Sequence, residues 1–126
     1  MEQGCHALTW FEIPVTDIDR ATRFYETLLN KQLRREFMGG IALGVFPHDE
    51  NSGVGGCLQA GPGLAPAGTG TIVYLDAGPS IDTVLKRVGV SGGKIALDKT
   101  ALPPGMGYFA HIIDSEGNRV GVHALN

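Results

Sequence analysis

The feature that most limits how this chain can fold is an internal repeat. Residues 51–60, NSGVGGCLQA, align with residues 114–124, DSEGNRVGVHA, near the other end of the chain. In each half the aligned segment closes the same predicted order of elements, a strand, a helix and three further strands. The sequence therefore predicts two copies of one βαβββ unit, over residues 1–62 and 69–126, joined by a connector rich in glycine and proline.

Hydrophobic periodicity and capping residues place the elements of each unit. Apolar residues recur at helical spacing between Ile18 and Leu28, and Thr16 or Asp17 can cap that helix. Ser80 is the expected cap of the second helix. The expected strands are 8–15, 31–37, 41–46 and 54–60 around a helix at 16–30, and 71–77, 92–98, 107–113 and 119–125 around a helix at 79–89.

Composition excludes several classes of function. The 126 residues are 43% hydrophobic and 18% charged, which is typical of a globular chain. A net charge of −3 without a cluster of lysine and arginine argues against nucleic acid or an anionic membrane as a partner. No apolar run has the length of a membrane span or of a secretory signal. We therefore expect a cytoplasmic protein in which Cys5 and Cys57 are reduced thiols.

One helix covers one face of a sheet, so each predicted sheet has a second face on which mixed residues gather. If the two curved sheets face a common space, these residues line one cavity, the usual form of a small-ligand site. Residues 103–109, PPGMGYF, are expected to form either a mobile flap over its mouth or an ordinary tight connection. The expected ligand-binding residues are Trp10, Glu12, Cys57, Gln59, Ile72, Tyr74, Met106, Tyr108 and His123, with Arg119 on the same face.

Two motifs connect this pattern with a known family. The first is D-x-x-x-A-x-x-F-Y, running from Asp17 to Tyr25, and the second is D-x-E-G-N-R, running from Asp114 to Arg119. With the doubled βαβββ order, the chain resembles the vicinal oxygen chelate superfamily, which includes glyoxalase I, bleomycin-resistance proteins and extradiol dioxygenases. The resemblance implies an α+β fold of two tandem modules, whose curved mixed sheets form a cavity. It also implies a homodimer.

The resemblance further implies where a divalent metal would be held. Enzymes of the superfamily bind the metal through histidine, glutamate or glutamine at four strand positions. Carried over by motif spacing, these positions fall on Trp10, Cys57, Gly70 and Gly121, none of which is a histidine or a carboxylate. A single thiol does not make a metal site. We therefore expect the usual metal site to be lost and no cofactor to be bound.

Three functions remain open at this point. The first is a metal-free protein that binds a small organic ligand, with Trp10 either as a stacking wall or as filler. The second is a lyase, isomerase or dioxygenase, either metal-independent with Glu12 and His123 as base and acid, or using a rebuilt metal site. The third is a non-catalytic interaction module. Glu12 can also serve only to pair with Arg119 or His123, and His111 is expected to be a structural or surface histidine.

Overall fold

The structure is a computed structural model, and it describes residues 6–126. Cys5 lies outside the described residues, and Cys57 is a buried free thiol. The fold is α+β, with two four-stranded mixed sheets and two helices in the described part of the chain. Among the helices described, none has the length and apolar character needed to span a membrane.

The predicted order of elements is confirmed in both halves of the chain. We call β1–β4 with α1 the first unit and β5–β8 with α2 the second unit. Their bounds are β1 Trp10–Pro14, α1 Ile18–Leu29, β2 Arg34–Met38, β3 Ile41–Val45, β4 Gly55–Ala60, β5 Tyr74–Asp76, α2 Ile81–Ser91, β6 Lys94–Ala101, β7 Tyr108–Ile113 and β8 Arg119–Ala124.

The two helices begin by different means. Of the two predicted caps of α1, Asp17 is the one used, since its carboxylate accepts the N–H of Arg20 at 3.0 Å. Ser80 stands at the cap position of α2, but its side chain makes no capping hydrogen bond. Instead, the backbone carbonyl of Asn126 accepts the first-turn N–H of Ile81 at 2.8 Å. A backbone carbonyl after β8 therefore satisfies a first-turn N–H group of α2, whereas a side chain does so for α1.

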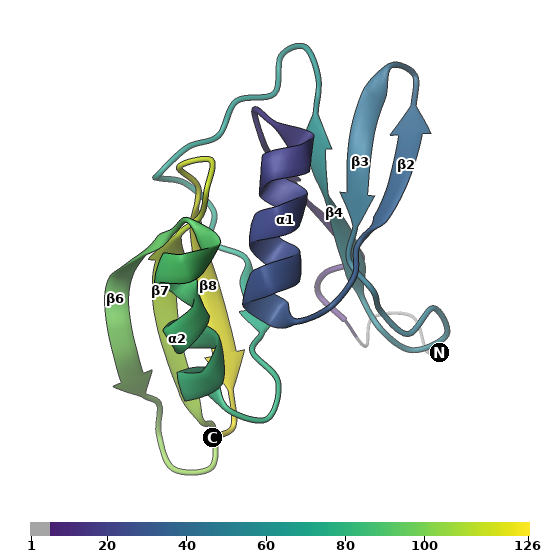
Figure 1. Cartoon of the computed structure of the whole chain (residues 1–126). Helices are drawn as coiled ribbons and strands as arrows, with labels where there is room; N and C mark the ends of the chain where they lie inside the picture. Colours follow the sequence, from purple (N-terminus) through teal and green to yellow (C-terminus); the bar gives the residue numbers. More distant parts are fainter. Residues whose placement is uncertain (1–5) are drawn as a thin grey trace.

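The two sheets have the same internal order. The first runs β1-β4-β3-β2 and the second β5-β8-β7-β6, and in each the first and last strands of the unit pair in parallel. Both helices lie on the near side of the sheets in Figure 1 and pack against each other. One hydrophobic core runs beneath them through both units. In the part of the chain that the structure describes, no helix covers the opposite face of either sheet.

The units also meet at the edges of their sheets. Asn118, just before β8, donates from its side-chain amide to the carbonyl of Pro14 at 2.7 Å and accepts the N–H of Ala67 with its side-chain oxygen at 3.0 Å. This places β1 beside the connector that leads into β5. The strands themselves do not pair across this line, because the eight strands form two separate sheets.

The turn between β7 and β8 holds the two units together, and we call its contacts the inter-unit latch. Glu116 accepts the N–H groups of Thr16 and Asp17 at 3.0 and 2.9 Å, and it pairs with Arg20 at 2.7 Å. Beside it, the buried hydroxyl of Tyr25 donates to Asp114 at 2.6 Å. Asp17 and Tyr25 belong to the first sequence motif and Asp114 and Glu116 to the second, so both motifs take part in docking the units.

Burial alone would raise the pKa of Glu116, but hydrogen bonds from Arg20, from the N–H groups of Asp17 and Thr16 and from the Ser115 hydroxyl lower it to about 2. The carboxylate therefore stays ionised while its side chain is fully buried. The inter-unit latch therefore depends on the negative charge of Glu116. Protonation of this carboxylate at acid pH should weaken the contact between the units.

Candidate functional site

The candidate site lies on the face of the two sheets that no helix covers, which we call the open face. Strand alternation defines it, because Ile13, Leu58, Leu75 and Val122 point into the core beneath the helices. Their strand neighbours therefore point the other way. The open face carries Trp10, Glu12, Cys57 and Gln59 from the first unit and Tyr74, Phe109, His111, Arg119 and His123 from the second.

In the first unit this face is largely filled. Glu12 and Cys57 are neighbours in the β1–β4 pairing, and Gln59 donates to the Glu12 carboxylate at 2.9 Å. Cys57 is fully buried against Leu43 and Val45. Burial and the nearby Glu12 carboxylate raise the pKa of the Cys57 thiol to about 11, although a hydrogen bond from Trp10 acts in the opposite direction. At neutral pH this thiol is protonated, so it is a poor nucleophile and a poor metal ligand.

Trp10 combines the two roles that its sequence position allowed. It lowers the pKa of the nearby Cys57 thiol, and its ring meets that of His48 edge-on with centroids 6.0 Å apart. The side chain nevertheless remains 39% exposed. It therefore fills part of the face and still presents aromatic surface to the outside.

The backbone register shows which positions of the two units correspond. Val15 donates its N–H to Gln59, and Ala77 donates in the same way to His123, at 2.9 and 2.8 Å. Gln59 and His123 are therefore equivalent, as the sequence alignment predicted. Counting back five residues from Val15 and from Ala77 makes Trp10 equivalent to Ile72.

This register corrects one of the positions carried over for the metal. Gly70 lies in the connector with a φ of +105°, before β5 begins, and Ile72 takes the position equivalent to Trp10. The four positions are then Trp10, Cys57, Ile72 and Gly121. They offer one protonated thiol, two apolar side chains and a glycine, which do not fit a divalent metal. Within residues 6–126, no group of three histidine, cysteine or carboxylate side chains is arranged to hold one.

In the second unit the open face carries a hydrogen-bonded chain of three side chains. The Tyr74 hydroxyl lies 2.6 Å from Nε2 of His111, and Arg119 donates from Nε to Nδ1 of His111 at 3.0 Å. The rings of Tyr74, Phe109 and His111 pack together, with centroids 5.5 to 6.1 Å apart. Burial and the Arg119 charge lower the pKa of His111. The imidazole is therefore neutral at physiological pH.

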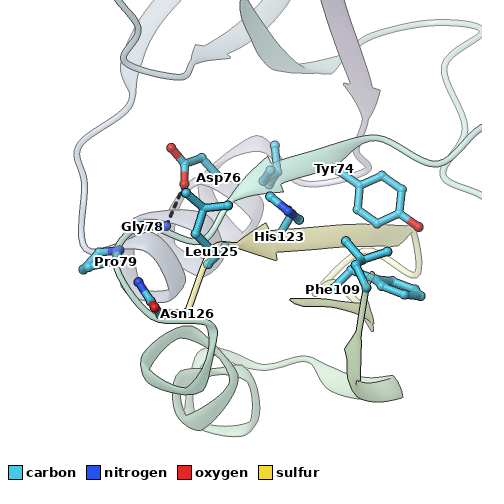
Figure 2. Close-up of a pocket in the computed structure, with 11 residues that line it drawn as sticks. Tyr74, Asp76, Gly78, Pro79, Phe109, His123, Leu125 and Asn126 are labelled. Carbon is cyan, nitrogen blue, oxygen red and sulfur yellow. Dashed lines mark hydrogen bonds between the residues drawn. The ribbon is translucent and has the colours of Figure 1, made fainter. Parts of the chain in front are cut away.

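A cavity of about 960 Å³ opens beside Tyr74 and Phe109 (Figure 2). Tyr74 and Phe109 lie at one end in the figure, Asp76, Pro79 and Asn126 lie at the other, and His123 lies between them. His123 is held by a 2.8 Å hydrogen bond from Nε2 to the carbonyl of Met106, in the loop before β7. The size and the mainly apolar walls suit a small organic molecule.

The location of this cavity differs from the expectation of one space shared by both units. All of its lining residues come from the second unit. Two smaller cavities, of about 160 and 220 Å³, do lie where the units meet. The smaller of the two is bordered by Glu12 on one side and by Arg119 on the other. The first unit offers less room because Trp10 and Cys57 occupy its part of the face.

The expected binding residues are placed as follows. Trp10, Glu12, Gln59, Tyr74 and His123 lie on the open face, and Ile72 lies half-buried just before β5. Met106 is exposed and contributes its carbonyl. Glu12 and His123, the expected base and acid, come from different sheets and form no hydrogen bond with each other among the contacts of the described residues.

Tyr108 does not belong to the open face. It packs against the core on the helix side of β7, with the Lys99 ammonium 4.4 Å from its ring centroid. Phe109, which the sequence analysis did not name, and His111, which it expected to be structural or at the surface, lie on the open face instead. The signal that could have found them is the alternation of faces along a strand, since Ala110 and Ile112 point into the core and are fully buried.

Comparison with known proteins agrees with this architecture. A family model described as bleomycin resistance protein-like N-terminal matches residues 7–34. Glyoxalase I from Zea mays has a similar structure, with a TM-score of 0.65 and 19% identity over 93% of this chain. This chain spans only 45% of the maize chain. No curated protein matches the sequence.

Two solved structures of similar length to this chain are alike in fold. A glyoxylase/bleomycin resistance protein/dioxygenase domain from Frankia sp. EAN1pec has a TM-score of 0.67 and 19% identity, over 95% of this chain and 98% of that one. The fosfomycin resistance protein FosX from Listeria monocytogenes has a TM-score of 0.62 and 16% identity, over 98% and 94%. The fold that the resemblance implied is confirmed: the chain has the glyoxalase/bleomycin-resistance/dioxygenase fold.

Proposed function

We propose that this protein binds a small organic ligand on the open face, without a metal. The observation that carries the proposal is the cavity of about 960 Å³ beside Tyr74, Phe109 and His123, where apolar walls meet a few hydrogen-bonding groups. Resistance proteins with this fold support a small organic compound as the class of ligand. Trp10 and the Glu12 carboxylate extend the face and would contact a ligand that reaches the first unit.

The donor chemistry at the four metal positions supports binding without a metal. A protonated thiol at Cys57 would have to lose its proton against a pKa of about 11 before it could bind a cation. The other three positions are Trp10, Ile72 and Gly121, whose side chains offer no oxygen, sulfur or imidazole nitrogen to bind a metal. We therefore assign the ligand's affinity to aromatic contact and hydrogen bonds, with no role for a Lewis acid.

An enzyme of the same superfamily is the alternative, with Glu12 and His123 as base and acid or with a rebuilt metal site. No contact among the described residues joins these two groups. The alternative predicts that Glu12→Gln abolishes turnover of a bound compound while the protein stays folded. Turnover retained in that variant would exclude Glu12 as the base.

We further propose a cytoplasmic homodimer. Phe37 and Met38, on the outer strand β2, are 72% and 70% exposed, which a second copy of the chain could cover. Light scattering coupled to gel filtration tests this directly. A dimer that becomes monomeric with Phe37→Asp and Met38→Asp would support it, and a monomeric wild type would refute it.

The function itself is tested on untagged protein purified without chelator. Elemental mass spectrometry before and after dialysis with nickel, zinc, manganese and iron(II) should find less than about a tenth of an equivalent of each metal. A screen of aromatic compounds for shifts in Tm should then find binders, since a compound at a hundred times its Kd adds about 2.7 kcal/mol to stability. One equivalent of a single retained metal would overturn the metal-free proposal.

A further inference from the structure

The hydrogen bonds that link Tyr74, His111 and Arg119 determine which ring nitrogen of His111 carries the proton. The guanidinium of Arg119 is a donor only, so its Nε–H bond to Nδ1 of His111 requires a lone pair on Nδ1. The ring is neutral with that nitrogen unprotonated, so the proton is on Nε2. Nε2–H must therefore donate to the Tyr74 oxygen, which lies 2.6 Å away. His111 thereby orients the tyrosine.

The consequence is that this part of the open face presents donors. Because its oxygen already accepts from His111, the Tyr74 hydroxyl has its own proton available for another partner. The terminal NH₂ groups of Arg119 do not take part in the bond to His111. Among the ion pairs of residues 6–126, none includes Arg119. Arg119 is half-buried as a residue, so its guanidinium has a charge available for an anionic partner.

The surroundings favour an organic body next to these donors. Tyr74 is 49% exposed, and its ring packs against Phe109 at the end of the cavity. Glu12, across the small crevice from Arg119, is held by Gln59 instead of by the guanidinium. Glu12, the carboxylate of the first unit that borders this crevice, therefore does not form an ion pair with Arg119.

We propose that Tyr74 and Arg119 bind the carboxylate of an organic anion whose aromatic or apolar body lies in the adjacent cavity. The proposal rests on the small-ligand function above and names the ligand's chemical class. A carboxylate lying across the edge of His111 accepts one hydrogen bond from the hydroxyl and one from the guanidinium. His111 does not touch the ligand in this arrangement and acts by positioning both donors.

The test compares benzoate with its neutral analogue benzamide at fixed pH. Binding is followed by ligand-observed NMR titration on the full-length protein. We expect benzoate to bind at least tenfold more tightly than benzamide. Tyr74→Phe keeps the ring and removes the donor, and Arg119→Gln removes the charge; each should weaken benzoate about tenfold or more and leave benzamide unchanged. Arg34→Gln, on the exposed strand β2, is the matched control and should change neither.

The outcomes separate this proposal from the one it rests on. Equal binding of both probes would refute the carboxylate site and leave the small-ligand function standing. Binding of neither probe up to tens of millimolar would refute the carboxylate site, while organic binders found in the Tm screen would still preserve the function. Long-range ¹H–¹⁵N correlation spectra of His111 give an independent readout that needs no ligand. A proton on Nδ1 would refute the positioning argument, whereas a proton on Nε2 alone would support it.

Discussion

Replacing the carboxylate of Glu116 should destabilise the protein in a manner that depends on pH. The pKa of Glu116 falls from 4.5 to about 2 in the folded protein. Each unit of pKa corresponds to about 1.36 kcal/mol, so ionisation of this group contributes about 3 kcal/mol at most. Arg20 is half exposed, and solvent screening reduces the figure toward 2 kcal/mol.

The sign follows from the direction of the shift. Because the folded pKa is depressed, the stabilisation is fully present above pH 4.5 and is lost as pH falls toward 2. Between pH 7 and pH 3 the wild type should lose about 1–2 kcal/mol through this one group. Glu116→Gln keeps an oxygen that can accept the N–H groups of Thr16 and Asp17, but it cannot ionise. It should be about 2–3 kcal/mol less stable than wild type at pH 7 and about 1 kcal/mol less stable at pH 3.

Urea denaturation at pH 7, 5 and 3 measures this difference, and tryptophan fluorescence reports the unfolding. Other carboxylates titrate in the same range, so the informative quantity is the gap between wild type and Glu116→Gln at each pH. The exposed Glu50 provides a control, since Glu50→Gln should follow the wild type. A gap that stays constant from pH 7 to pH 3 would refute the reasoning, because the lost interaction would then not be the charge.

Three shorter predictions concern other parts of the structure. Tyr25→Phe removes the buried 2.6 Å bond to Asp114 and should cost about 2 kcal/mol in urea denaturation, with the fold retained; a cost below 0.5 kcal/mol would contradict the geometry. Cys57, with a pKa of about 11, should react with iodoacetamide at pH 8 at least a hundredfold more slowly in the folded protein than in urea, as followed by peptide mass mapping; equal rates would contradict its burial. Asp17→Ala removes the cap of α1 and should lower stability by about 1 kcal/mol, whereas Ser80→Ala should have almost no effect, a contrast that thermal melting can measure.

The order of elements could be predicted from the sequence because each is encoded locally. The apolar stripe from Ala21 to Leu28 needs only helical spacing to be recognised, and Gly117 adopts the positive φ expected of its turn. Asn126 shows where local reasoning stops. Its carbonyl caps α2 from the far end of the second unit, a contact that no pattern around Ser80 could reveal.

The site was harder to predict because two neighbouring aromatic residues differ only in the face they occupy. Tyr108 and Phe109 are adjacent and similar in character, yet only Phe109 lies on the open face. Pairing of β7 with β8 decides this, since it sets Ala110 opposite Val122 under the helix. The role of His111 likewise depends on Tyr74 and Arg119, 37 and 8 residues away, and becomes visible only when β5 and β8 lie side by side.

Tyr74 also constrains how this protein could change over evolutionary time. It is the strand neighbour of Gly121, and a Cβ atom at position 121 would lie 2.4 Å from the tyrosine ring. A carboxylate therefore cannot be acquired at position 121 by one substitution while Tyr74 keeps its place, and losing Tyr74 first would remove its hydroxyl from the open face. A side chain at position 121 therefore requires the Tyr74 ring to move, and that movement would break its 2.6 Å hydrogen bond with His111.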